Sequence, residues 1–108
     1  MVAKYRVLLV CAAGMSSSLL EASTIEAAKK RGHEMEIRAI PVPEMTLQDF
    51  KAHPVDIILV APQVSYKRRA IAQMAEPLGI VVLGIEPVTY GMVDGERLFE
   101  QIVRAVTV

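Results

Sequence analysis

Cys11 is the only cysteine of the chain, and it ends an apolar stretch that begins at Val7. Small and hydroxyl-bearing residues follow it and lead into a helical pattern: Ala12-Ala13-Gly14-Met15-Ser16-Ser17-Ser18. A helix N-terminus lowers the pKa of a thiol because it stabilises the thiolate, which is the nucleophilic form. The first helical turn also leaves backbone N–H groups unpaired, and such groups bind anions. The pattern therefore predicts an ionised Cys11 beside a bound anion, and it suits a phosphoryl group carried on the sulfur.

The stretch from Val10 to Leu20 contains no charged residue, and this limits which reactions of a bound phosphoryl group the loop could favour. Thiol-based phosphatases carry an arginine six positions after the cysteine, and in this chain Ser17 occupies that position. An anion here would be held by neutral N–H and hydroxyl donors and by a helix dipole. We expect such a site to favour holding and passing on a phosphoryl group over fast hydrolysis.

The elements that must position this loop alternate between strand and helix. Apolar runs predict strands at 5–10, 56–61 and 80–85, and a polar–apolar alternation predicts an edge strand at 34–40. Helices are expected from about residue 17 to 30 or 31, at 46–51 (starting at Pro43 or Thr46), at 65–75, and after Asp94. A loop is expected from 86 to 94. This order predicts one α/β domain over residues 1–108, with parallel strands and helices on both faces.

Ligands of such sheets lie beyond the carboxyl ends of the strands, so Cys11 should share one rim with the loops after residues 61 and 85. The candidate phosphate or partner contacts on this rim are Gln63, Tyr66, Lys67, Arg68, Tyr90 and Asp94. All of them except Tyr66 also have an ordinary structural interpretation. These are a turn for Gln63, core packing for Tyr90, a helix N-cap for Asp94 and a solvated helix face for the basic residues.

The composition limits the classes of function. The 108 residues include 12 basic and 12 acidic side chains, and a net charge of zero predicts no affinity for nucleic acid. A single cysteine forms no internal disulfide, and no apolar run approaches the roughly 20 residues of a membrane span. His33 and His53 are expected to be solvated at the opposite rim, so neither should act as a base or share a metal with Cys11. We expect a cytoplasmic monomer without metal or cofactor.

Three segments resemble the IIB components of the lactose/cellobiose (chitobiose) class of the bacterial sugar phosphotransferase system (PTS). They are residues 8–20, the run 58–66 with Ala61-Pro62-Gln63-Val64-Ser65-Tyr66, and Tyr90-Gly91-Met92-Val93-Asp94-Gly95. The resemblance implies a four-stranded parallel sheet of order 2-1-3-4, like that of low-molecular-weight tyrosine phosphatases. It also implies that Cys11 is phosphorylated and that residues 12–18 form the phosphate loop.

The same resemblance implies the partners. A phosphohistidine of a IIA protein would supply the phosphoryl group, and a sugar bound by the membrane protein IIC would accept it, with a β-glucoside-type disaccharide expected. The chain departs from the family at Ala61, where glycine is usual, and in the basic run Lys67-Arg68-Arg69. Cations at a helix start oppose its dipole, so these residues are candidates for attracting an acidic partner or screening the phosphate. Two alternatives stay open: a thiol redox or sensing protein and a regulatory anion-binding module.

Overall fold

The computed structural model describes residues 4–12 and 17–106. Within this part of the chain, four parallel strands form one sheet in the order β2-β1-β3-β4, so the predicted fold class and strand order are confirmed. The strands are β1 (Lys4–Cys11), β2 (Glu34–Pro41), β3 (Ile57–Val60) and β4 (Val81–Gly84).

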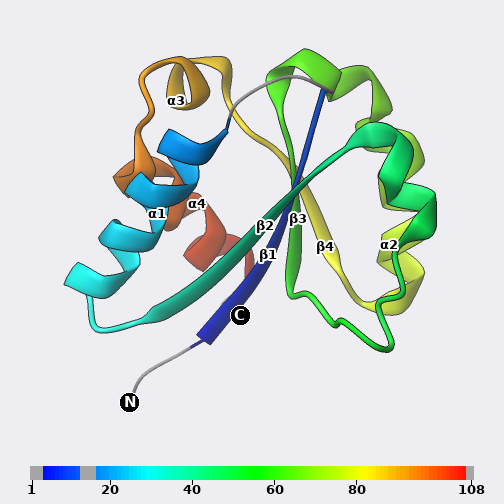
Figure 1. Ribbon diagram of the computed structural model, residues 1–108, viewed down its shortest axis with the longest axis horizontal. Coiled ribbons are helices and arrows are strands. Elements are labelled where there is room, and N and C mark those ends of the chain that lie inside the picture. Colours follow the sequence, from blue (N-terminus) through cyan, green and yellow to red (C-terminus); the bar gives the residue numbers. More distant parts are fainter. Residues whose placement is uncertain (1–3, 13–16, 107–108) are drawn as a thin grey trace.

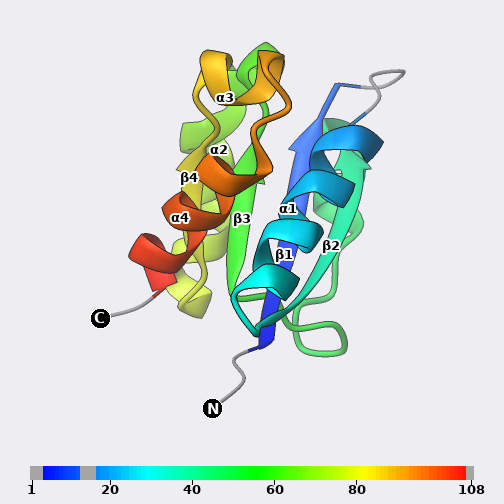
Figure 2. The same cartoon turned by 90° about the vertical axis from the view of Figure 1, so that its left-hand side faces the viewer.

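Helices cover both faces of the sheet. Figure 1 shows α1 and α4 on one face and α2 on the other, and Figure 2 shows α1 beside α4. The α-helices are α1 (Ser18–Lys30), α2 (Arg68–Ala75), α3 (Pro87–Gly91) and α4 (Gly95–Val106). Three 3-10 helices accompany them: η1 (Val42–Leu47), η2 (Pro62–Lys67) and η3 (Glu76–Leu78).

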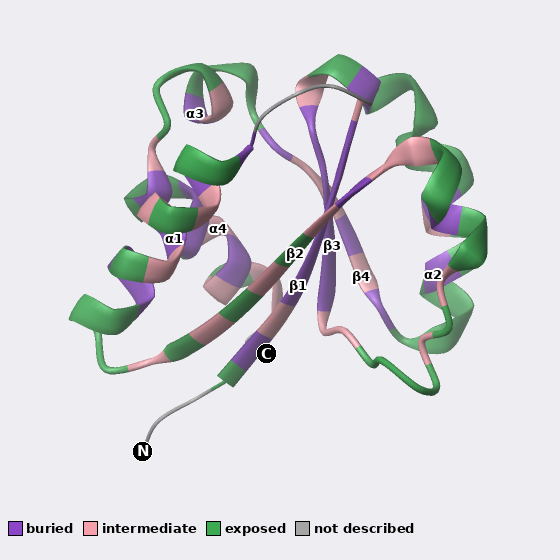
Figure 3. Ribbon diagram, in the orientation of Figure 1, coloured by how far each residue is buried: buried purple, intermediate pink, exposed green. Residues whose placement is uncertain are grey.

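The core follows from the positions of the strands in the sheet. Residues 7–10 and 57–60 form the central strands and are almost fully buried, because helices cover both of their faces (Figure 3). Each buried valine, leucine or isoleucine side chain contributes about 1.5–3 kcal/mol through removal of apolar surface from water. The edge strand β2 instead alternates exposed charged residues with partly buried apolar ones, as its sequence predicts.

Of the two starts predicted for the helix at 46–51, the one at Pro43 is close to the observed start, and the predicted end at residue 51 is wrong, because the 3-10 helix η1 covers Val42–Leu47. Helix η1 begins at Val42. Pro43 is suited to this first turn, because proline has no backbone N–H group to be paired there. Beyond it, the Asp49 carboxylate accepts hydrogen bonds from the backbone N–H groups of Lys51 and Ala52 at 3.0 and 3.2 Å. Such a local turn competes with helical hydrogen bonding and ends the helix.

The segments that follow β3 and β4 also differ from their predictions. The chain after β3 first forms η2, with a break at Val64, and regular helix begins only at Arg68 and not at residue 65. The expected loop at 86–94 contains the short helix α3, which Pro87 opens with its preset φ. In both places a proline begins a short helical turn directly after a strand.

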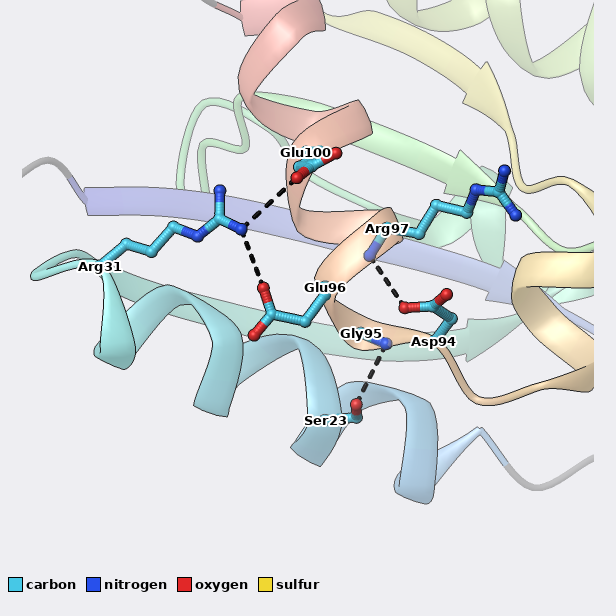
Figure 4. Close-up of polar contacts among 7 residues, drawn as sticks. All are labelled: Ser23, Arg31, Asp94, Gly95, Glu96, Arg97 and Glu100. Carbon is cyan, nitrogen blue, oxygen red and sulfur yellow. Dashed lines mark hydrogen bonds and ion pairs between the residues drawn. The ribbon is translucent and has the colours of Figure 1, made fainter.

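Helices α1 and α4 pack closely through Ser23 and Gly95. The Gly95 N–H donates to the Ser23 hydroxyl at 3.0 Å, and Asp94 caps α4 by accepting from the Arg97 N–H at 3.0 Å (Figure 4). A Cβ on Gly95 would overlap the backbone of Ser23. Arg31, just after α1, reaches across to Glu96 and Glu100 at 3.0 and 3.4 Å (Figure 4).

The two histidines lie away from Cys11 but in different surroundings. His33 precedes β2 and was expected to be solvated, yet it is half-buried against the rings of Tyr5 and Phe99, with centroids 5.7 and 5.9 Å away. Its neighbours are aromatic because β1 and α4 meet there. His53 is exposed, as predicted. Among the described residues, no group of three or more His, Cys, Asp or Glu side chains is arranged to hold a metal ion.

Candidate functional site

Cys11 is the last residue of β1 and lies at the carboxyl end of the sheet. It is 6% exposed, and its thiol donates a hydrogen bond to the Ile40 carbonyl oxygen at 3.5 Å. The predicted loop residues Ala13, Gly14, Met15 and Ser16 lie outside the described residues, whereas Ala12 packs against the core. Only the protonated sulfur can donate the hydrogen bond to the Ile40 carbonyl oxygen.

The electrostatic surroundings of Cys11 differ from the sequence prediction. Burial raises the pKa of the thiol, and the negative charge of Glu21 raises it further. Both effects act against the stabilisation of the thiolate that a helix N-terminus would provide. Ionisation of Cys11 stays a prediction, because residues 13–16 of the loop lie outside the described residues.

Glu21 is a residue of the site that the sequence analysis missed. It lies in the first turn of α1, and its carboxylate accepts a hydrogen bond from the Ser17 hydroxyl at 2.7 Å. Ser17 occupies the N-cap position, but its hydroxyl binds this carboxylate and not a backbone N–H. Ser18 is the exposed first residue of the helix. The sequence could have indicated Glu21, because it is the acidic residue in the first turn of the helix that follows the cysteine loop.

Tyr90 meets the same cluster from the other side. It lies in α3, its ring packs against the core, and its hydroxyl oxygen is buried without a hydrogen-bond partner in the described part of the chain. Burial raises the pKa of the Tyr90 phenol, with smaller contributions from Cys11 and Glu21. Cys11, Glu21 and Tyr90 therefore form one electrostatically connected cluster.

The loop after β3 lies next to Cys11 through the strand register. Val10 pairs with Val60, and the Ala61 N–H donates to the Val10 carbonyl oxygen at 2.9 Å. Helix η2 then carries Gln63, Tyr66 and Lys67 outward, and all three are exposed. The Lys67 ammonium nitrogen lies 6.0 Å from the centre of the Tyr66 ring.

The remaining candidate residues are either exposed on the surface or have a structural role. Arg68 and Arg69 begin α2 and are exposed, so these side chains are available to a partner. Asp94 has the structural role considered from the sequence, since its carboxylate caps α4. The rim thus holds a buried Cys11 with the half-buried Glu21 and Tyr90, and an exposed margin along η2 and the start of α2.

Comparison with known proteins defines the class of protein. The family model for the PTS system lactose/cellobiose-specific IIB subunit matches residues 6–101. The chain therefore belongs to this family of PTS IIB components, which are phosphotransferases that transfer phosphate to sugar. No helix in the described part of the chain is long and apolar enough to cross a membrane.

Named relatives and solved structures agree with this assignment. The chain is 35% identical to the oligo-beta-mannoside-specific EIIB component of Bacillus subtilis (strain 168), over 89% of this chain and 90% of that one. It is 34% identical to the cellobiose-specific EIIB component of Lactococcus lactis subsp. lactis (strain IL1403), over 83% and 85%. A cellobiose-specific IIB protein from Borrelia burgdorferi has a TM-score of 0.72 at 28% identity, covering 95% of this chain and 92% of that one. The lactose-specific IIB domain from Streptococcus pneumoniae shares the fold, with a TM-score of 0.77 at 20% identity over 94% and 97%.

Proposed function

We propose that the chain carries a phosphoryl group on Cys11, between a phosphohistidine of a IIA protein and a sugar bound by a membrane IIC protein. The observation that carries this proposal is the position of the only cysteine, at the end of β1 and ahead of the N-terminus of α1. Membership of the IIB family supports the choice of reaction.

The raised pKa of Cys11 is compatible with this chemistry. The sulfur attacks the phosphorus, the S–P bond forms as the N–P bond of the phosphohistidine breaks, and the bonding pair passes to the imidazole. The leaving imidazole takes up a proton, and the thiol releases one, so the step balances without a base in this chain. In the second step a sugar hydroxyl attacks the phosphorus, the S–P bond breaks, and the hydroxyl proton restores the thiol.

The charges near the sulfur favour onward transfer. The described residues place the Glu21 carboxylate near Cys11, and Ser17 stands where a thiol phosphatase has its arginine. Like charges repel more strongly in a partly buried site than in water, so Glu21 raises the free energy of a phosphoryl dianion on the sulfur. A raised ground state lowers the barrier to passing the group to a sugar.

The relatives support a sugar as the final acceptor, and their names differ in which one. The cellobiose-specific relative supports the predicted β-glucoside-type disaccharide, while other relatives are named for oligo-beta-mannoside and galactose. Transient contacts with IIA and IIC fit the predicted cytoplasmic monomer. The redox and regulatory alternatives have less support, because the family model and the named relatives are all PTS IIB components.

The test is phosphorylation in a reconstituted system. The chain is incubated with phosphoenolpyruvate, the two general PTS proteins and a IIA protein of the lactose/cellobiose class, and its intact mass is measured. We expect a mass gain of one phosphoryl group that is absent in Cys11→Ser. A gain that persists in Cys11→Ser, or no gain with any IIA of this class, would overturn the proposal.

A further inference from the structure

The buried hydroxyl of Tyr90 lacks a hydrogen-bond partner. Its oxygen is shielded from solvent, and no acceptor or donor in the described part of the chain lies within hydrogen-bond distance. Most buried side-chain polar atoms are paired, so an unpaired one in a native fold calls for an explanation. A ligand that arrives only in one functional state would explain it.

Tyr90 lies at the end of the sheet where the phosphoryl group would be carried. Figures 1 and 2 show α3 at the same end as the last residues of β1 and the first turn of α1. The electrostatic influence of Cys11 and of Glu21 on the Tyr90 phenol is consistent with this proximity. The buried hydroxyl of Tyr90 thus belongs to a helix at the same end of the sheet as Cys11.

The neighbours of Tyr90 already have other partners. The Cys11 thiol donates to the Ile40 carbonyl oxygen, and the Glu21 carboxylate accepts from Ser17. A phosphoryl group on Cys11 would bring three strong acceptor oxygens into this cluster. A phenol is a neutral donor, and it suits a site that has no cation between Val10 and Leu20.

We propose that the Tyr90 hydroxyl donates a hydrogen bond to the phosphoryl group on Cys11 and so stabilises the phosphorylated state. The inference rests on the proposed function and adds a specific side-chain ligand to it. The backbone holds Tyr90 in place through two hydrogen bonds, from its own N–H to Glu86 O and from the Val93 N–H to Tyr90 O, at 3.0 and 3.2 Å. The Tyr90 hydroxyl would lower the free energy of the phosphoryl group on Cys11, whereas the charge of Glu21 would raise it by repulsion.

The first test compares Tyr90→Phe with Tyr66→Phe. Both changes remove one hydroxyl and keep the ring, and Tyr66 is 75% exposed at the same end of the molecule. The measured quantity is the equilibrium constant for phosphoryl transfer from phospho-IIA, obtained from the intact masses of both proteins. We expect Tyr90→Phe to lower it about tenfold, which corresponds to about 1.4 kcal/mol, and Tyr66→Phe to leave it unchanged. Equal constants for Tyr90→Phe and the wild type would overturn the inference while leaving phosphorylation of Cys11 intact.

A second measurement separates direct contact from altered packing. Tyr5, Tyr66 and Tyr90 are the three tyrosines of the chain, so labelling with 13C at the ring carbon bearing the hydroxyl gives three resolvable NMR signals. On phosphorylation we expect the Tyr90 signal to shift as its hydroxyl gains an acceptor, with the Tyr5 and Tyr66 signals unmoved. A Tyr90 signal that does not move on phosphorylation would contradict the inference. Failure of the wild type to become phosphorylated would instead overturn the proposed function, and this inference with it.

Discussion

Burial and the nearby charge of Glu21 raise the pKa of the Cys11 thiol, which donates a hydrogen bond to the Ile40 carbonyl oxygen. A carrier benefits from such a group, because a neutral sulfur at rest reacts slowly with metals, oxidants and electrophiles. Phosphohistidine is an activated donor whose leaving group takes up a proton, so a fully ionised thiol is not required. Under the proposed function, Glu21 would both protect the resting sulfur and destabilise the phosphorylated one.

Replacing Glu21 with Gln tests this electrostatic role. The pKa of Cys11 should fall, because the repulsion that helps to raise it is removed while burial stays. The measurement is the rate of alkylation of the thiol as a function of pH, whose midpoint should move to lower pH. Glu26→Gln, at an exposed position on the same helix, is the matched control and should leave the midpoint in place. An unchanged midpoint in Glu21→Gln would show that burial alone sets the thiol pKa.

The sequence predicted Cys11 but not its electrostatic environment. The uncharged stretch from Val10 to Leu20 suggested a neutral site, yet one turn of helix brings Glu21 back beside the strand end. Tyr90 is separated from Cys11 by most of the chain, and the position of α3 at the carboxyl end of the sheet brings them to the same end of the molecule. Contacts of this kind depend on the path of the backbone, which residue types at single positions do not encode.

The strands were predictable because the central ones are buried on both faces and read as continuous apolar runs. The sequence analysis misplaced the end of η1 and did not predict α3, because helices of five or six residues show too little periodicity to recognise. Both helices have a proline in the first turn and follow a strand. The junction after α3 is unusual, because Val93 adopts a φ of 52°. Such a conformation is costly for a β-branched residue and often marks a functional segment.

Val93→Gly should relieve this strain. Glycine adopts positive φ at no steric cost, and Val93 is 37% exposed, so little apolar contact is lost. We expect the free energy of unfolding, measured by urea denaturation, to rise by about 1 kcal/mol. Val88→Gly is the control, because the same change inside α3 at an ordinary φ should lower stability by about 1 kcal/mol. If both variants lose stability equally, Val93 is not strained.

Gly95→Ala tests the close contact of α1 and α4. The added methyl group would overlap Ser23, so the two helices must separate and the Gly95–Ser23 hydrogen bond lengthens. We expect a loss of about 1–3 kcal/mol in the free energy of unfolding. Gly91→Ala is the control, since a Cβ there meets nothing within 4 Å and should cost little. A fully stable Gly95→Ala would mean that the two helices move apart without cost.

The whole molecule carries no net charge, so any electrostatic attraction between it and a partner must come from local patches. The exposed side chains of Lys67, Arg68 and Arg69 form the basic cluster of the rim, where η2 joins α2. The pairing of Val10 with Val60 ties the start of η2 to the end of β1, so this cluster follows the segment that lies next to Cys11. A IIA protein that presents a phosphohistidine on an acidic surface would be guided by it.

Replacing all three residues of the basic cluster with Gln should slow phosphoryl transfer from phospho-IIA at low ionic strength, by a factor on the order of ten. The transfer rate of the wild type should fall as salt is added, because salt screens the attraction, and the variant should show a flatter dependence. The matched control replaces Lys29, Lys30 and Arg104, which lie in the last turns of α1 and α4 at the other end of the molecule, and removes the same number of charges. At about 0.1 M salt, where the Debye length is about 10 Å, its rate should equal that of the wild type, and at lower salt its rate should fall less than that of the cluster variant, because the replaced charges lie at the other end of the molecule. Parallel salt profiles for the wild type and the cluster variant would show that these cations are solvated surface residues without a part in docking.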